Sequence, residues 1–122
     1  MPELVFSVTS GDNRLPFEIL ESKVAGLQSK KVDEGVEIRF VKGTIHEGLL
    51  PGPETYTFLI YLADNIVIPT AVGILSAYVY DKLKSKSDAK LKIGEIDIRI
   101  DEGEIKRILI REFEKSESKK KR

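Results

Sequence analysis

Apolar and polar residues alternate with two different periods in the first third of the chain. Residues 4–9 are mostly β-branched or aromatic and stop at a cluster of turn-forming residues, which predicts a strand. Over residues 16–30, apolar residues recur at spacings of three and four, which predicts an amphipathic helix. Residues 36–41 alternate apolar and charged side chains, as in a strand with one solvated face. The chain therefore begins with a predicted β-α-β unit.

A segment rich in glycine and proline follows, and after it comes a long apolar run. Residues 43–54 contain three glycines and two prolines, which is typical of a connecting loop. Residues 57–80 are almost free of charge, but an Asp-Asn pair and a proline interrupt them. The pattern predicts a helix that begins at residue 65 or 69 and ends near residue 84. Residues 58–62 fit either a buried strand or a first helical segment.

The last third of the chain predicts a β-hairpin and a helix. Residues 90–100 alternate apolar and charged side chains around a Gly-Glu pair that fits a two-residue turn. Asp101 and Glu104 have the spacing of a helix-capping pair, and the apolar stripe after them predicts a helix over residues 102–115. Residues 116–122 are polar and end in a basic run, so we expect a disordered tail there.

Together these elements predict a single α+β domain over residues 1–115, in the order β-α-β-(loop)-α-β-β-α. A chain of 122 residues is long enough to bury one hydrophobic core. An isolated hairpin is only marginally stable, so the strands are expected to share one sheet of about four strands. The apolar helix is expected at the centre of the fold.

The apolar run also has the length of a membrane span. Residues 58–80 exceed the roughly 20 residues that cross a bilayer, and tyrosines lie near both ends. A span would place Asp64 and Asn65 inside the hydrocarbon and would leave a carbonyl unpaired before Pro69. It would also separate the predicted strands onto the two sides of the membrane. We therefore favour a buried core helix, with an oligomer-interface helix and a membrane span as the alternatives.

Composition excludes several classes of function. Lys+Arg and Asp+Glu both total 20, so the formal net charge is zero and charge alone does not predict a nucleic-acid partner. The chain has no cysteine and one histidine, which excludes disulfides, thiolate chemistry and Cys/His zinc sites. Many charges with little Asn, Gln and Met are typical of hyperthermophile proteins, although an A/T-rich genome gives a similar pattern. The first residues do not resemble a secretion signal, so a cytoplasmic location is expected.

Few side chains are candidates for chemistry. His46 is followed by Glu47 in the predicted loop and would serve as a lone base or metal ligand, but a solvated loop histidine is the favoured interpretation. Asp64 would support a carboxylate-dependent enzyme if it lay in a cleft with a raised pKa, whereas a helix N-cap at this position is the simpler interpretation. The acidic group over residues 95–104 lacks the spacing of a calcium loop. We expect no catalytic residue, metal or cofactor.

Two basic segments are the candidates for binding phosphate. They cover residues 82–92 and 119–122, and no aromatic residue is interleaved in either. The chain also lacks a glycine-rich phosphate loop and a helix-turn-helix signature. Lysines at a helix C-terminus complement the helix dipole, and a basic tail favours solubility. Nucleic acid is therefore not the expected partner.

The apolar helix is the predicted interface. Its apolar side chains are distributed around most of its circumference, whereas packing on a sheet needs only a stripe about 100° wide. Gly73 and Ala77 lie one turn apart and would let the same helix of a second copy approach closely about a two-fold axis, burying Tyr78. We therefore expect a non-enzymatic protein-protein interaction or adaptor module that forms a homodimer or contacts another protein.

The order of elements also resembles a known family. Strand, helix and strand are followed by a glycine/proline loop, an apolar helix over residues 71–84 that ends in a basic segment, a hairpin, and a helix opened by Asp101. This order resembles the effector-associated constant components of prokaryotic conflict systems. The resemblance implies a non-enzymatic adaptor that couples a sensor to an effector through protein contacts, and it implies no catalytic residue.

Overall fold

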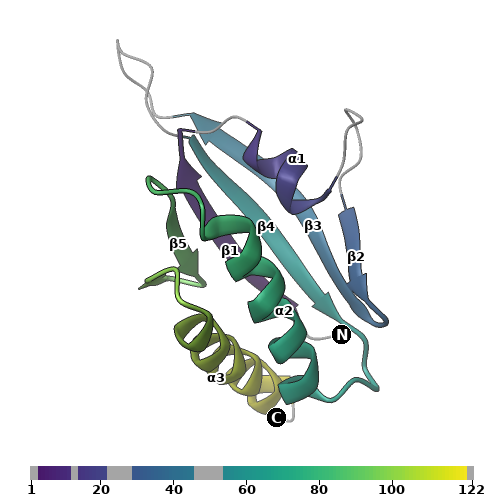
Figure 1. The fold of residues 1–122 in the computed structure, drawn as a ribbon. Coiled ribbons are helices and arrows are strands. Elements are labelled where there is room, and N and C mark those ends of the chain that lie inside the picture. Colours follow the sequence, from purple (N-terminus) through teal and green to yellow (C-terminus); the bar gives the residue numbers. More distant parts are fainter. Residues whose placement is uncertain (1–2, 12–13, 22–28, 46–53, 121–122) are drawn as a thin grey trace.

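The computed structural model describes residues 3–11, 14–21, 29–45 and 54–120. They form one antiparallel sheet with its helices on one face (Figure 1). The elements in chain order are β1 (Glu3–Ser10), α1 (Leu15–Ile19), β2 (Ser29–Asp33), β3 (Val36–Ile45), β4 (Glu54–Leu62), α2 (Ile68–Leu83), β5 (Lys90–Ile93), β6 (Ile96–Ile98) and α3 (Glu102–Lys120).

The predicted α+β class is confirmed, but the sheet is larger than expected. It has six strands in the order β2-β3-β4-β1-β5-β6, whereas about four were predicted. Every neighbouring pair is antiparallel, and β1 lies between β4 and β5 in the interior. The expected element order therefore lacked two strands, β2 and β4.

Strand β2 replaces the end of the predicted first helix. Helix α1 ends at Ile19, and residues 29 and 30, which were predicted to be helical, pair with β3 instead. Gly35 closes this β2–β3 hairpin with φ = 73°, a conformation that glycine adopts without strain. A Cβ on Gly35 would also lie 3.1 Å from the Cβ of Ala63. The central part of the predicted helix, residues 22–28, lies outside the described residues.

Strands β3 and β4 extend into the predicted glycine/proline loop. Gly43, Thr44 and Ile45 belong to β3, and Glu54 begins β4, so the loop expected over 43–54 is shorter than predicted. Residues 46–53 lie outside the described residues. The segment 58–62, for which strand and helix were both open, is part of β4, because β1 and β3 pair with it on its two sides.

Helix α2 confirms the predicted helix in the apolar run. It begins at Ile68 with a proline in its first turn, where a missing N–H costs nothing. The N-cap residue is Val67 and no side chain caps the helix, so the N-cap role expected of Asp64 is wrong. One side of α2 is buried, and no helix in the described ranges is long and apolar enough to cross a membrane.

The predicted hairpin and last helix are confirmed, with one change of boundary. Gly94 takes φ = 60° in the turn between β5 and β6. The amide of Glu104 donates to Oδ2 of Asp101 at 3.0 Å, as the capping pattern predicts. Helix α3 continues to Lys120, beyond the expected end near residue 115, so the predicted tail begins as helix.

The hydrophobic core lies between the sheet and its helices. Helices α2 and α3 pack on each other, and α1 contacts α2 (Figure 1). Three aromatic side chains form a row across β1, β4 and β3 beneath the helices: Phe6 stacks on Phe58 at 5.0 Å between ring centroids, and Phe40 tilts against Phe58 at 5.5 Å. Helix α2 lies between α1 and α3 in the layer over the sheet, with one side buried and the other exposed, so it is not enclosed at the centre of the fold as the sequence predicts.

Candidate functional site

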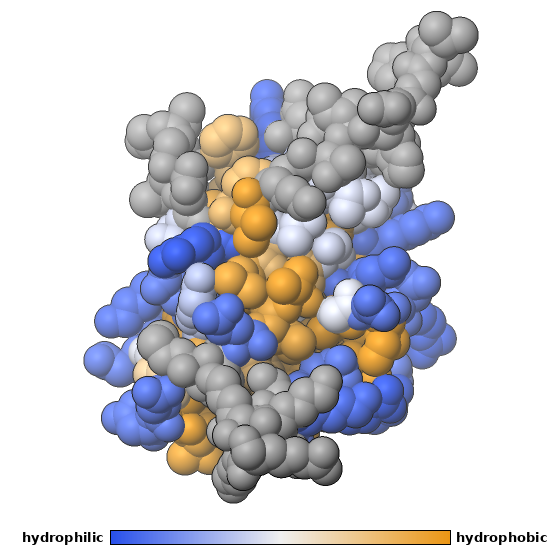
Figure 2. Space-filling model, turned by 180° about the vertical axis from the view of Figure 1, so that it is seen from behind, coloured by the Kyte–Doolittle hydropathy of each residue, from blue (hydrophilic) through white to orange (hydrophobic). Residues whose placement is uncertain are grey.

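The candidate site is the face of the sheet over which none of the described helices lies, called the uncovered face. Side chains of a strand alternate between the two faces, and residues flanking the buried ones in β1, β3 and β4 point away from the helices. Within the described residues, no helix lies over this second face. Figure 2 views it directly and shows apolar residues gathered in its middle between charged residues on both sides.

The middle of this face is an uncharged strip two strands wide. The strip consists of Val5, Ser7 and Thr9 of β1 and Thr55, Thr57, Leu59 and Tyr61 of β4. Val5 lies opposite Leu59, and the Thr9 and Thr55 hydroxyls are hydrogen-bonded at 2.9 Å. Val5 is 39% exposed, and Val41 of neighbouring β3 is 51% exposed. The strip is apolar at one end and bears hydroxyls at the other.

Charged side chains of both signs flank the uncharged strip. On β3, the Arg39 guanidinium lies 4.8 Å from the Tyr61 ring centroid and 3.8 Å from the Glu37 carboxylate. On the opposite flank, Lys92 of β5 pairs in register with Asp97 of β6. An uncharged centre with a mixed polar rim is the usual anatomy of a protein-protein interface.

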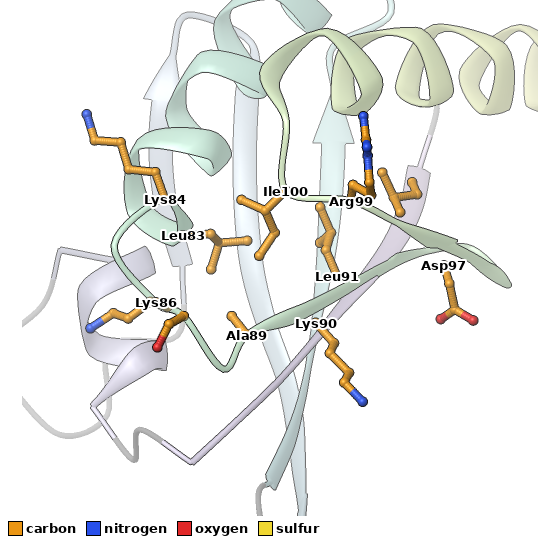
Figure 3. Close-up of a pocket in the computed structure, with 11 residues that line it drawn as sticks. Leu83, Lys84, Lys86, Ala89, Lys90, Leu91, Asp97, Arg99 and Ile100 are labelled. Carbon is orange, nitrogen blue, oxygen red and sulfur yellow. The ribbon is translucent and has the colours of Figure 1, made fainter.

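A cleft at the β5–β6 end of the molecule is less suited to binding a ligand. It has a volume of about 710 Å³, and its floor is formed by Leu83, Leu91 and Ile100 (Figure 3). The cations around it are Lys84, Lys86, Lys90 and Arg99. In Figure 3 the labelled lysines extend away from the cleft, and Lys86 is paired with Glu18 at 2.7 Å. The cations therefore do not converge on one point where an anion would bind.

A cluster of ion pairs attaches α1 to the rest of the molecule. The Glu21 carboxylate contacts Lys30 at 2.9 Å and Lys82 at 3.1 Å, and hydrogen bonds from Lys30 and then Lys82 lower the pKa of this carboxyl. The Tyr78 hydroxyl donates to the carbonyl of Ile19. Burial, together with the negative charge of Glu21, raises the pKa of Tyr78. These groups bind one another, which indicates a structural role.

The three predicted interface residues of α2 differ in how exposed they are. Gly73 lies on the outer side of the helix, where a Cβ would meet nothing within 4 Å, and Ala77 is exposed. Tyr78 is partly buried against α1, and the Lys82 ammonium lies 5.2 Å from its ring centroid. The structure therefore leaves Gly73 and Ala77 accessible, while Tyr78 is engaged within its own chain.

Of the two other candidate residues, Asp64 lies within the described residues and His46 lies outside them. Asp64 is exposed in the turn between β4 and α2. In the part of the chain that the structure describes, no group of three or more His, Cys, Asp or Glu side chains is placed to hold a metal ion.

Comparison with models of known protein families, with curated proteins and with solved structures gives no match in any of the three. Sequence reasoning missed the uncovered face because it left residues 58–62 without an assignment. The alternation of threonine with aromatic residues over 55–58 is the available signal for the two faces at the start of β4, but residues 58–62 are all apolar and show no alternation.

Proposed function

We propose that the protein is a non-enzymatic interaction module that self-associates through the uncovered face of its sheet. The observation that carries the proposal is the uncharged strip on β1 and β4, with Val5 and Leu59 paired at its apolar end. Exposed apolar residues that are contiguous and rimmed by polar ones mark interaction sites. The flanking charges have both signs, which suits a protein surface of mixed charge better than a polyanion.

The outer side of α2 is the second candidate surface. Gly73 and Ala77 would permit a close helix approach. However, they offer little apolar area, and the larger apolar residues of α2 are mostly buried in the core. Burial of apolar area contributes about 25 cal/mol per Å². A partner on the uncovered face would bury more apolar area than a partner on the outer side of α2, and the complex would therefore be more stable.

An adaptor role, as the resemblance to effector-associated constant components implies, belongs to the same proposal. So does a cytoplasmic location. A membrane-anchored protein would need detergent for its recovery. Recovery of the chain in the soluble fraction without detergent would therefore support this proposal against that alternative. Replacing Asp64 by Asn separates it from a carboxylate-dependent enzyme, because an interaction module would keep its association.

Self-association is tested by light scattering after size-exclusion chromatography over about two orders of magnitude of protein concentration. We expect a rising mass for the unchanged chain and a constant monomer mass for Leu59→Glu, which places a charge in the strip beside Arg39. Gly73→Leu is the matched control, because the fold has space for its side chain. A chain that stays monomeric at every concentration would contradict the proposal, and loss of association only in Gly73→Leu would move the interface to α2.

A further inference from the structure

We infer that the partner on the uncovered face is a second copy of this chain, related by a two-fold axis that runs parallel to the strands between β1 and β4. The inference rests on the proposed self-association and adds its geometry. Two six-stranded sheets would stack about 10 Å apart with their helices on the outside, as in a β-sandwich.

The register of β1 and β4 makes the uncharged strip self-complementary about this axis. Val5 lies opposite Leu59, Ser7 opposite Thr57, and Thr9 opposite Thr55. A two-fold rotation between the two strands exchanges the members of each pair. It therefore sets each of these six residues over its own cross-strand neighbour in the second copy, with apolar residues over apolar ones and hydroxyls over hydroxyls. This is the isologous contact that a symmetric dimer requires. The seventh residue of the strip, Tyr61, lies opposite Glu3 and would be set over that exposed residue of the second copy.

An axis perpendicular to the strands is less favourable. If it passed through the middle of the strip, it would place Val5 and Leu59 over Thr9 and Thr55 of the second copy. Apolar side chains would then face hydroxyl groups, which lose hydrogen bonds to water when they are covered. The chemical gradient along the strip therefore favours the parallel axis.

The flanking charges favour this arrangement at one position and oppose it at another. The parallel axis sets β3 over β5 of the second copy, so Arg39 approaches the β5–β6 turn that contains the exposed Glu95. The registers of β3 with β4, β4 with β1 and β1 with β5 set Lys42 over Lys92 of the second copy, a like-charge contact that weakens the association and that added salt would screen. The formal net charge of zero removes long-range repulsion between identical chains.

The area of the uncovered face indicates how tightly two copies are expected to bind. The four interior strands span about 19 Å, and the length of β1 is about 27 Å, so the plan area is about 500 Å² per copy. Standard interfaces bury about 800 Å² per partner. We therefore expect a dimer of about micromolar affinity, which forms within the concentration range of the scattering experiment.

Single-cysteine cross-linking tests the axis, because the chain has no cysteine of its own. Val5→Cys and Thr9→Cys are each treated with a bismaleimide that spans about 8 to 10 Å, close to the spacing of stacked sheets. Both positions lie beside the proposed axis, so each variant should cross-link to its own copy. Lys92→Cys lies on the same face but on the second strand from the axis, so it should not cross-link to its own copy. Ala77→Cys tests whether the outer side of α2 forms the interface instead.

The outcomes separate this inference from the proposed function. A dimer that cross-links at Val5→Cys and Thr9→Cys, but not at Lys92→Cys, supports the parallel axis. A dimer that cross-links at only one β1 position, or at neither, overturns the axis while self-association stands. Cross-linking at Ala77→Cys alone assigns the interface to α2. A monomer at every concentration overturns both proposals. Unchanged circular dichroism of each variant establishes that the fold is intact.

Discussion

The two faces of the sheet are built from the same strands and differ in what covers them. In β4, Phe58 and Ile60 are fully buried beneath the helices, while Thr57 and Leu59, which alternate with them along the strand, remain partly exposed. In β1, buried Phe6 adjoins Val5, which is 39% exposed. Because successive side chains point to opposite faces, one strand supplies both the core and the uncovered face.

This difference separates the residues that hold the fold from those available for recognition. The covered face is closely packed, and loss of a large side chain there removes apolar contacts and leaves a cavity. The uncovered face contributes little packing within one chain, so its residues are free to serve association. Four substitutions test this division, from the largest expected effect on stability to the smallest.

Phe58→Ala should give the largest loss of stability. Phe58 is fully buried and lies between Phe6 and Phe40 in the aromatic row. Truncation of a buried phenylalanine costs about 3 to 5 kcal/mol, which a denaturant titration resolves as a lower midpoint. Ser7→Ala on the uncovered face is the control and should change stability by less than about 0.5 kcal/mol. Similar losses of stability for both variants would show that the two faces contribute equally to the fold, which contradicts the division.

Helix α2, helix α3 and the β5–β6 hairpin were predictable from the sequence, whereas helix α1 and the rest of the sheet were predictable only in part. Helix α2 and the β5–β6 hairpin have long or clearly punctuated patterns, and both were found. Strand β2 was missed because it carries one apolar residue, Val32, and is defined by its pairing with β3. The apolar spacing after Pro16 favours a helix, but residues 29 and 30 pair as strand, so tertiary pairing overrides local periodicity there.

The candidate site was harder to predict than the fold. The α2 residues Gly73 and Ala77 were chosen because the helix is apolar on most sides, and the sequence does not show how much of that surface α1, α3 and the sheet cover. The uncharged strip depends on the register of Val5 with Leu59, two residues far apart in the chain. Such a long-range pairing has no local signature.

Asp101→Ala should give the next largest loss, because α3 helps to cover the buried face. Asp101 accepts a hydrogen bond from the amide of Glu104 at the start of α3. Removal of an N-cap side chain costs about 1 kcal/mol, which thermal unfolding detects as a lower Tm. Asp97→Ala removes the same charge from an exposed position of β6 and is the matched control. An equal change in Tm for the two variants would exclude the cap as the cause.

Tyr78→Phe should lower stability by a similar amount and should also alter its dependence on pH. The hydroxyl donates to the carbonyl of Ile19, and a net loss of about 0.5 to 1.5 kcal/mol is expected at neutral pH. Burial raises the pKa of Tyr78, so the folded chain retains this proton at pH values where the unfolded chain, with a pKa of about 10, loses it. Stability from this group is therefore fully present below about pH 10 and declines above it. Denaturant titrations of both chains between neutral pH and about pH 11 should show a smaller decline in Tyr78→Phe. An identical decline would show that Tyr78 does not contribute to it.

Val5→Thr should give the smallest change and most directly sharpens the comparison of the two faces. Threonine keeps the β-branched shape that suits β1, so a monomer should lose less than about 0.5 kcal/mol. In the proposed dimer, however, the substitution places a hydroxyl over Leu59 of the second copy. Because association stabilises the folded state by mass action, the Tm of the unchanged chain should rise with protein concentration, and the Tm of Val5→Thr should rise less. Calorimetry at low and high protein concentration measures the Tm of both chains. Equal Tm values at low concentration that diverge at high concentration would assign Val5 to recognition, whereas a large difference at low concentration would assign it to the fold.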